Sequence, residues 1–215
     1  MADSCCPPPL NLDNSLRNPV ADARYRRVLW VVLGINAAMF LVEIAAGLAA
    51  GSASLHADAL DFLGDAGNYA ISLFVVGMAL KYRASAALAK GTTMAAFGLW
   101  VVAMVIWHAA HGTLPSAFTM GTVGLAALTA NAASFGLLWV YRGGDANMRS
   151  AWICTRNDVI GNIAVLAAAL GVFGTGTGWP DVVVASIMAA LALQGAVSVV
   201  RQSLSELRPI SVPAE

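Results

Sequence analysis

The chain has 215 residues, and its 12 lysine and arginine residues balance its 12 aspartate and glutamate residues, so the formal net charge is zero. Hydrophobic residues make up 59% of the chain and charged residues only 11%, which is less charge than a soluble domain of this length carries. The composition excludes an ordinary soluble domain, and the balanced charge gives no reason to expect a nucleic-acid partner. Runs of about 20 apolar residues instead predict an all-α polytopic membrane protein.

The first segment of the chain, about 27 residues long, is polar overall and contains several arginines. We expect residues 1–27 to form a cytoplasmic N-terminal tail. The apolar run that follows is too long for the core of a secretory signal. Cys5 and Cys6 lie next to each other in a proline-rich stretch, where they either capture soft metal ions or belong to a disordered tail. Adjacent cysteines rarely bridge each other, and Cys154 is the third and last, so no disulfide framework is predicted.

Six apolar segments follow the tail, and we predict that each of them crosses the membrane. The predicted spans are about 28–50, 55–80, 86–111, 116–141, 149–173 and 180–200. Lys81 and Arg83 are expected to stop the second span, and glycine-containing turns separate several of the others. Residues 28–200 therefore form a six-helix transmembrane domain. We expect residues 201–215 to form a short cytoplasmic C-terminal tail, because so few residues are not expected to fold by themselves.

The positive charges indicate the orientation of these spans. Arginines precede the first span and follow the sixth, and the others lie around the junctions of spans two and three and of spans four and five. The loops after spans one, three and five contain neither lysine nor arginine. Under the positive-inside rule both termini are cytoplasmic. Lys90 and Arg156 fall inside predicted spans, and we expect their side chains to extend to the near interface.

Five carboxylates fall inside the predicted spans, where each costs about 2.5–3.5 kcal/mol on insertion scales. They are Glu43 in the first span, Asp58, Asp61 and Asp65 in the second, and Asp158 in the fifth. The three second-span aspartates and Asn68 are spaced +3, +4 and +3, which makes one continuous stripe on a helix. No buried lysine is expected to neutralise them. Like charges on one stripe repel unless protons or a cation neutralise them.

The fifth predicted span repeats the four-residue spacing at Cys154, Asp158 and Asn162. Two such pairs on facing helices supply four ligands, which is the number that tetrahedral zinc takes. At 1.5 Å per residue, Asp65 and Asp158 both lie about 13–15 Å into the membrane, near the middle of a core about 30 Å thick. The two helices run antiparallel, so Asp61 and Cys154 fall on opposite sides of that plane. Convergence of all four side chains therefore needs helix tilt or rotation.

Two segments give the sequence a resemblance to a known family. Residues 51–65 (GSASLHADALDFLGD) and 147–158 (NMRSAWICTRND) resemble the second and fifth spans of the cation diffusion facilitator family of divalent-metal/proton antiporters. A weaker similarity covers residues 40–51, and Asn131 stands where many members carry asparagine. The resemblance extends from about residue 24 to residue 207.

The resemblance implies which residues would bind a metal ion. Asp61 and Asp65 would be the second-span ligands, and Asp158 would be the second ligand of the fifth span. Cys154 stands at the first ligand position of the fifth span, where members usually have histidine or aspartate. A thiolate there favours softer ions such as Zn²⁺ or Cd²⁺ over Mn²⁺. Alternatively, Cys154 is a bystander beside a three-carboxylate site.

The resemblance also implies the activity. It predicts a secondary transporter, not an enzyme, that exports a divalent metal cation from the cytoplasm in exchange for protons. Zn²⁺ is the first candidate, followed by Cd²⁺, Co²⁺ and Fe²⁺, and no cofactor besides the transported ion is expected. The resemblance implies a homodimer in the lipid bilayer, and the alanine-rich chain with short loops suggests a bacterial cytoplasmic membrane. Members usually carry a cytoplasmic metal-binding domain after the sixth span and often a histidine-rich loop, and we expect neither feature here.

Other interpretations remain open at this stage. One alternative is a membrane metal-binding or sensing accessory protein without turnover, and another is a proton-coupled carrier for an organic cation. Glu43 either pairs with a neighbouring helix or carries protons, and Asp58 either sets proton affinity, caps the helix start or binds the ion. Asn68 and Asn162 are hydrogen-bond partners of ligands or packing residues. The three histidines form an exit-side ion site or lie at the membrane interface: His56, His108 and His111.

Overall fold

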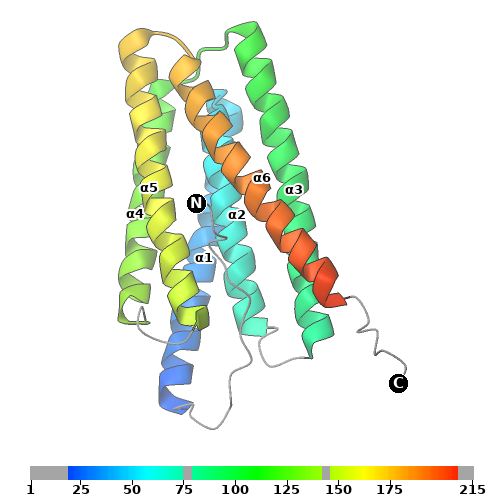
Figure 1. Cartoon of the computed structure of the whole chain (residues 1–215). Helices are drawn as coiled ribbons and strands as arrows, with labels where there is room; N and C mark the ends of the chain where they lie inside the picture. Colours follow the sequence, from blue (N-terminus) through cyan, green and yellow to red (C-terminus); the bar gives the residue numbers. More distant parts are fainter. Residues whose placement is uncertain (1–18, 75–78, 142–145, 208–215) are drawn as a thin grey trace, which may run out of the picture.

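The structure, a computed structural model, describes residues 19–74, 79–141 and 146–207. Side chains are described from residue 23 onward, except those at 80, 83 and 146–154. Six long helices and one 3₁₀ turn make up these ranges (Figure 1): α1 (Pro19–Ala50), α2 (Ala53–Phe74), α3 (Leu80–His111), α4 (Ala117–Leu138), η2 (Trp139–Tyr141), α5 (Ala146–Thr175) and α6 (Trp179–Leu207). The described residues contain no strand. The predicted all-α fold is confirmed.

The outer surface of the bundle has the character of a membrane protein. Every helix except α2 contains a stretch long and apolar enough to cross a bilayer. Large apolar side chains point outward from these helices, and Phe118 and Phe173 are 82% and 80% exposed. Such exposure suits contact with lipid chains and would be costly in water.

Helix α2 lies inside the bundle and not at its surface. It packs against α1, α3, α5 and α6, and Figure 1 shows it among these helices. Its 22 residues are about 33 Å long at 1.5 Å per residue, enough to cross the hydrocarbon core. The three aspartates of α2 interrupt every apolar stretch of that length. The surrounding helices keep these carboxylates away from lipid, which makes the polar helix tolerable.

Several helix ends differ from the predicted spans. Within the described residues, α1 extends from Pro19 and α6 extends to Leu207. Helix α2 is described as far as Phe74, and residue 80, the predicted end of the second span, belongs to α3. Lys81 and Arg83, predicted to stop the second span, lie in the first turn of α3. An apolar run marks where side chains can face lipid, and backbone hydrogen bonding continues past it into polar residues.

The core of the bundle consists of two apolar clusters. One includes Leu55, Val101, Val165 and Ala185, and the other includes Leu29, Tyr69 and Leu138. Along α1, α2 and α4, the stretches between these clusters include polar side chains. This polar layer contains Glu43, Asp58, Asp61, Asp65 and Asn131.

One end of the bundle carries the α1–α2, α3–α4 and α5–α6 turns, and we call it the turn end (Figure 1). Asp181, at the start of α6, is 1% exposed. It accepts hydrogen bonds from the Ser52 hydroxyl (2.7 Å), the Ala53 amide (2.8 Å), and the amide and hydroxyl of Ser54 (3.0 and 2.6 Å). Its carboxylate thus caps the N-terminus of α2 from another helix.

The other turns at this end also contact each other. The Ser116 amide donates to the Ala50 carbonyl at 3.0 Å and joins the start of α4 to the end of α1. The Gly178 backbone lies so close to the Thr113 carbonyl that no side chain would fit at residue 178. The three turns are therefore joined to one another at the turn end by hydrogen bonds and close backbone contacts.

Replacing Asp181 with alanine is expected to destabilise the protein by about 3 kcal/mol, because the N-terminus of α2 loses a buried charged acceptor. Thermal unfolding of the detergent-purified chain, followed by intrinsic tryptophan fluorescence, measures the effect. Asp181→Asn keeps one side-chain acceptor and should lose less. Equal melting temperatures for the alanine variant and the unmodified chain would contradict this role.

Candidate metal centre

The residues of the polar stripe of α2 face different helices. Asp58 faces α1 and α5, where it lies against Glu43 and accepts two hydrogen bonds from the Asn162 amide, both at 2.8 Å. Asp61 and Asp65 interact with Asp158 of α5. The predicted stripe is thus present, but its members have different partners.

Asp65 and Asp158 form a carboxyl pair between α2 and α5, in which Asp65 is buried and Asp158 is half-buried. Asp65 is 5% exposed, and its side chain reaches that of Asp158 across the α2–α5 interface. The Asp158 Oδ2 atom is buried and has no hydrogen-bond donor. Two carboxylates that meet in this way need a proton or a cation between them.

A tyrosine and a threonine hold Asp65 in place. The Tyr69 hydroxyl donates to Asp65 Oδ2 at 2.8 Å, and the same hydroxyl lies 2.7 Å from the Thr155 hydroxyl of α5. Tyr69 is 1% exposed and Thr155 is fully buried. This chain of hydroxyls fixes the Asp65 carboxylate and joins α2 to α5 on the side away from the turn end.

Asp61 approaches α5 at a glycine. Its Oδ2 atom lies 3.8 Å from the point that a Cβ atom on Gly161 would occupy, so this carboxylate lies beside the α5 backbone. Asp61 is half-buried and interacts electrostatically with Asp158. Asp61, Asp65 and Asp158 thus lie near one another at the α2–α5 interface.

Lys90 of α3 differs from the prediction. We expected its side chain to extend to the membrane interface and no lysine to neutralise the α2 aspartates. Instead, its ammonium group donates to the Asn68 side-chain oxygen, and it interacts electrostatically with Asp65. Its methylene groups pack where a Cβ on Gly67 would lie, with Lys90 Cγ at 3.0 Å. The lack of a side chain at residue 67 is the physical reason, because it gives the lysine a path to α2.

The predicted thiol ligand lies outside the described side chains. Cys154 belongs to α5, one helical turn before Asp158. Among the side chains that the structure describes, no three histidine, cysteine, aspartate or glutamate residues surround a common point that suits a metal ion. Asp158 interacts electrostatically with both Asp61 and Asp65, and a compact four-ligand site stays a prediction.

The histidines separate into a buried pair and a surface residue. His56 is fully buried, and its ring packs against Gly47, where a Cβ would lie 2.9 Å from His56 Cε1. His108 is 5% exposed and interacts electrostatically with His56. His111 is exposed and stacks on Trp107 with ring centroids 3.8 Å apart. The interface interpretation therefore fits His111 and not the other two.

Four residues that contact the polar residues or the N-terminus of α2 were not identified as functional from the sequence: Tyr69, Lys90, Thr155 and Asp181. A signal existed for Tyr69, which lies four residues after Asp65, and for Thr155, which lies three residues before Asp158. Both continue a stripe already recognised. Asp181 and Lys90 gave no local signal, because their partners lie on other helices.

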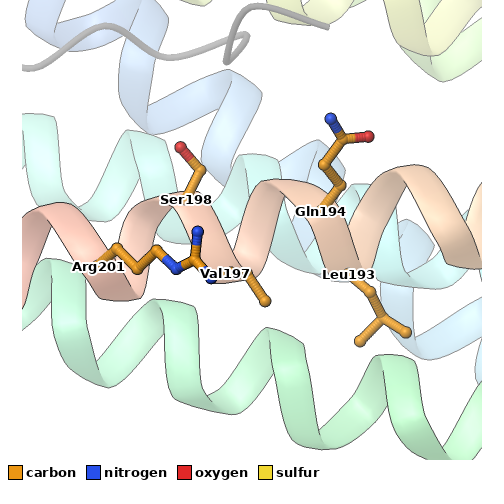
Figure 2. A pocket seen from close by; sticks show the side chains of 5 residues that line it. All are labelled: Leu193, Gln194, Val197, Ser198 and Arg201. Carbon is orange, nitrogen blue, oxygen red and sulfur yellow. The ribbon is translucent and has the colours of Figure 1, made fainter.

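A cavity of about 430 Å³ lies apart from the carboxylates. It runs along the second half of α6 (Figure 2) and is lined by Leu193, Gln194, Val197, Ser198 and Arg201. None of the acidic residues of α2 or α5 lines it. The candidate metal centre is therefore a packed interface between α2 and α5, separate from this surface cavity.

Comparison with known proteins gives a consistent set of similarities. A family described as "Cation efflux transmembrane domain" matches residues 29–208. Zinc transporter ZitB of Escherichia coli (strain K12) is 29% identical over 201 residues, covering 86% of this chain and 63% of that protein. Zinc transporter ZitB of Yersinia pestis is 27% identical over 202 residues, covering 86% and 64%. The chain thus spans less than two thirds of the length of these relatives.

Proposed function

Because the chain belongs to the cation efflux family, we propose that it is a secondary transporter that exports a divalent metal cation, first of all Zn²⁺, in exchange for protons. The observation that carries this proposal is the carboxyl pair of Asp65 and Asp158, in which Asp158 Oδ2 is buried without a donor. Zinc is the first choice because similar proteins are zinc transporters by name. Such a transporter performs no covalent chemistry and is not an enzyme.

We further propose Asp61, Asp65, Cys154 and Asp158 as the ligands of the transported ion. Three carboxylates and a thiolate would match the four-coordinate preference of Zn²⁺. The mutual repulsion of Asp61, Asp65 and Asp158 supports this assignment, because a bound cation would remove it. Tyr69 would keep Asp65 oriented while the ion enters or leaves.

Protons and the ion would compete for these carboxylates, so proton arrival releases the metal. The contacts among the three turns support access from the opposite end of the bundle in this conformation. The positive-inside pattern supports assigning the turn end to the outside and both termini to the cytoplasm. Alternating access would then move helices around a fixed site near the membrane centre. We also propose a homodimer in the cytoplasmic membrane.

The test is transport by purified protein in liposomes with an imposed pH gradient. Entry of Zn²⁺, Cd²⁺, Co²⁺, Fe²⁺ and Mn²⁺ is recorded with an enclosed metal-sensitive dye, with and without the gradient. Zinc flux that depends on the gradient is expected. Stoichiometric metal binding without flux would favour the alternative of a metal-binding or sensing accessory protein. Flux of organic cations alone would favour the organic-cation carrier.

Replacing Cys154 with serine is expected to change ion selectivity more than overall activity. Serine keeps the size of the side chain but removes the soft thiolate that favours Zn²⁺ and Cd²⁺. In the same liposomes, the ratio of Cd²⁺ flux to Mn²⁺ flux should fall by about tenfold, roughly the loss of 1.4 kcal/mol of discrimination. An unchanged ratio would identify Cys154 as a bystander beside a three-carboxylate site.

A further inference from the structure

Glu43 of α1 is a buried carboxyl group that the proposed metal site does not use. Its side chain is 0% exposed, and neither carboxyl oxygen has a hydrogen-bond donor. Its neighbour across the α1–α2 interface is the Asp58 carboxyl group, which is 1% exposed. A buried carboxylate without a donor is costly, so this residue needs a function or a compensating partner.

The other side of Asp58 is fully satisfied by amides. The Asn131 side-chain amide of α4 donates to Asn162 Oδ1 at 3.0 Å, which directs the Asn162 amide hydrogens toward Asp58. Asn162 Nδ2 then lies 2.8 Å from each oxygen of Asp58. This chain of amides stabilises Asp58 as the ionised member of the pair.

Glu43 and Asp58 therefore meet as two acceptors, and one proton between them would convert this contact into a hydrogen bond. We propose that the Glu43–Asp58 pair binds one proton of the transport cycle, at a site distinct from the metal ligands. This inference rests on the proposed proton exchange. The proton is bound to a Glu43 oxygen and forms a hydrogen bond to Asp58. It leaves as a free proton when the protonated state of the pair becomes less stable.

The surroundings of the pair connect it to the metal site. Asp61 interacts electrostatically with Glu43, and Asp158 does so with Asp58. A cation bound to Asp61 and Asp158 would reduce the negative electrostatic potential that stabilises the proton on the Glu43–Asp58 pair. Metal entry and proton release are therefore coupled.

Other titratable groups lie farther along the helices. From α3, Lys90 contacts Asn68 and His108 interacts with His56. Asp181 of α6 lies at the turn end, and the contribution of α4 is the neutral amide of Asn131. Among the described side chains, those that face the pair are thus acidic or neutral.

The experiment counts the protons released when Zn²⁺ binds the full detergent-purified chain. Calorimetry in buffers of different ionisation enthalpy gives this number. Glu43→Gln donates permanently to Asp58 and should release about one proton fewer per zinc than the unmodified chain. The double variant Glu43→Gln/Asp58→Asn should release no fewer than the single variant, because the two groups share one proton. Glu43→Asp, which keeps a carboxyl group, should retain the full number.

Asn36→Ala is the matched control. Asn36 lies seven residues before Glu43 on α1, is 1% exposed and does not titrate, so its loss should not change the proton count. The second readout is the infrared C=O stretch of protonated carboxyl groups in the metal-free chain, which zinc should remove. Because the Asp65–Asp158 pair can contribute to this band, the signal of the Glu43–Asp58 pair is the part of the band that Glu43→Gln abolishes.

The outcomes separate this inference from the proposed function. An unchanged proton count in Glu43→Gln, or a carboxyl band in the metal-free chain that Glu43→Gln leaves unchanged, would overturn the proton site while zinc transport by the unmodified chain stands. Loss of zinc stoichiometry in Glu43→Gln would make Glu43 a metal ligand and also overturn it. If the unmodified chain moves zinc without any pH dependence, the proposed proton exchange itself fails.

Discussion

Replacing Asp65 with asparagine is expected to abolish metal transport while leaving the helical bundle folded. The change removes one negative charge from the α2–α5 interface, and the asparagine oxygen can still accept the hydrogen bond from Tyr69. A proposed direct ligand should matter at least as much as an outer partner of a metal ligand, whose loss costs 10–100-fold. We therefore expect the zinc flux into liposomes to fall at least about 100-fold.

The matched control for this change is Ser134→Ala. Ser134 is fully buried in α4, and its hydroxyl has no hydrogen-bond partner, so its removal alters a buried polar atom without altering charge. Its zinc flux should stay within about twofold of the unmodified chain. Asp65→Asn with normal zinc flux and normal folding would remove Asp65 from the ligand set.

Replacing Asp158 with asparagine is expected to have opposite effects on stability and metal binding. In the metal-free chain, Asp158 Oδ2 is buried without a donor beside Asp65. An asparagine amide can donate to Asp65 and remove this conflict. The free energy of unfolding should rise by about 1–2 kcal/mol, whereas zinc affinity should fall at least about 100-fold because a charged ligand is lost.

The gain in stability should depend on pH in a defined direction. The aspartate pair needs a proton to satisfy both carboxyl groups, and that proton becomes harder to keep as the pH rises. The asparagine donor is present at every pH, so the difference in melting temperature should be larger in alkaline than in mildly acidic buffer. Asn157→Ala, beside Asp158 on α5, is the control for zinc affinity. A metal-free Asp158→Asn variant that melts below the unmodified chain would contradict this account.

This opposition has a general physical basis. A site for a dehydrated cation must keep several carboxylates together, and without the cation they repel each other. This repulsion destabilises the folded chain. The two apolar clusters on either side of the polar layer and the contacts at the turn end offset it. Stabilising substitutions at such a site therefore tend to remove its function.

The helical membrane fold and the stripe of α2 follow from local features of the sequence. Apolar runs of this length fit a helix that satisfies its own backbone in lipid, and the spacing of Asp58, Asp61 and Asp65 follows from 3.6 residues per turn. Because placing a charged side chain in the membrane costs free energy, we predicted a function for these aspartates, Glu43 and Asp158. Each of these steps depends only on local periodicity and on transfer energies, which a sequence contains.

Which helix each polar residue faces depends on how the helices pack. One stripe on α2 meets Glu43 and Asn162 at Asp58, Asp158 at Asp65, and Lys90 at Asn68. These pairings depend on how the helices rotate and cross, which small residues such as Gly67 and Gly161 permit. The hydrogen-bond partners of Asp181 could not be predicted from the sequence either, because they are 127 to 129 residues away in the chain. Helical periodicity sets the face on which a residue lies, and only packing sets what that face meets.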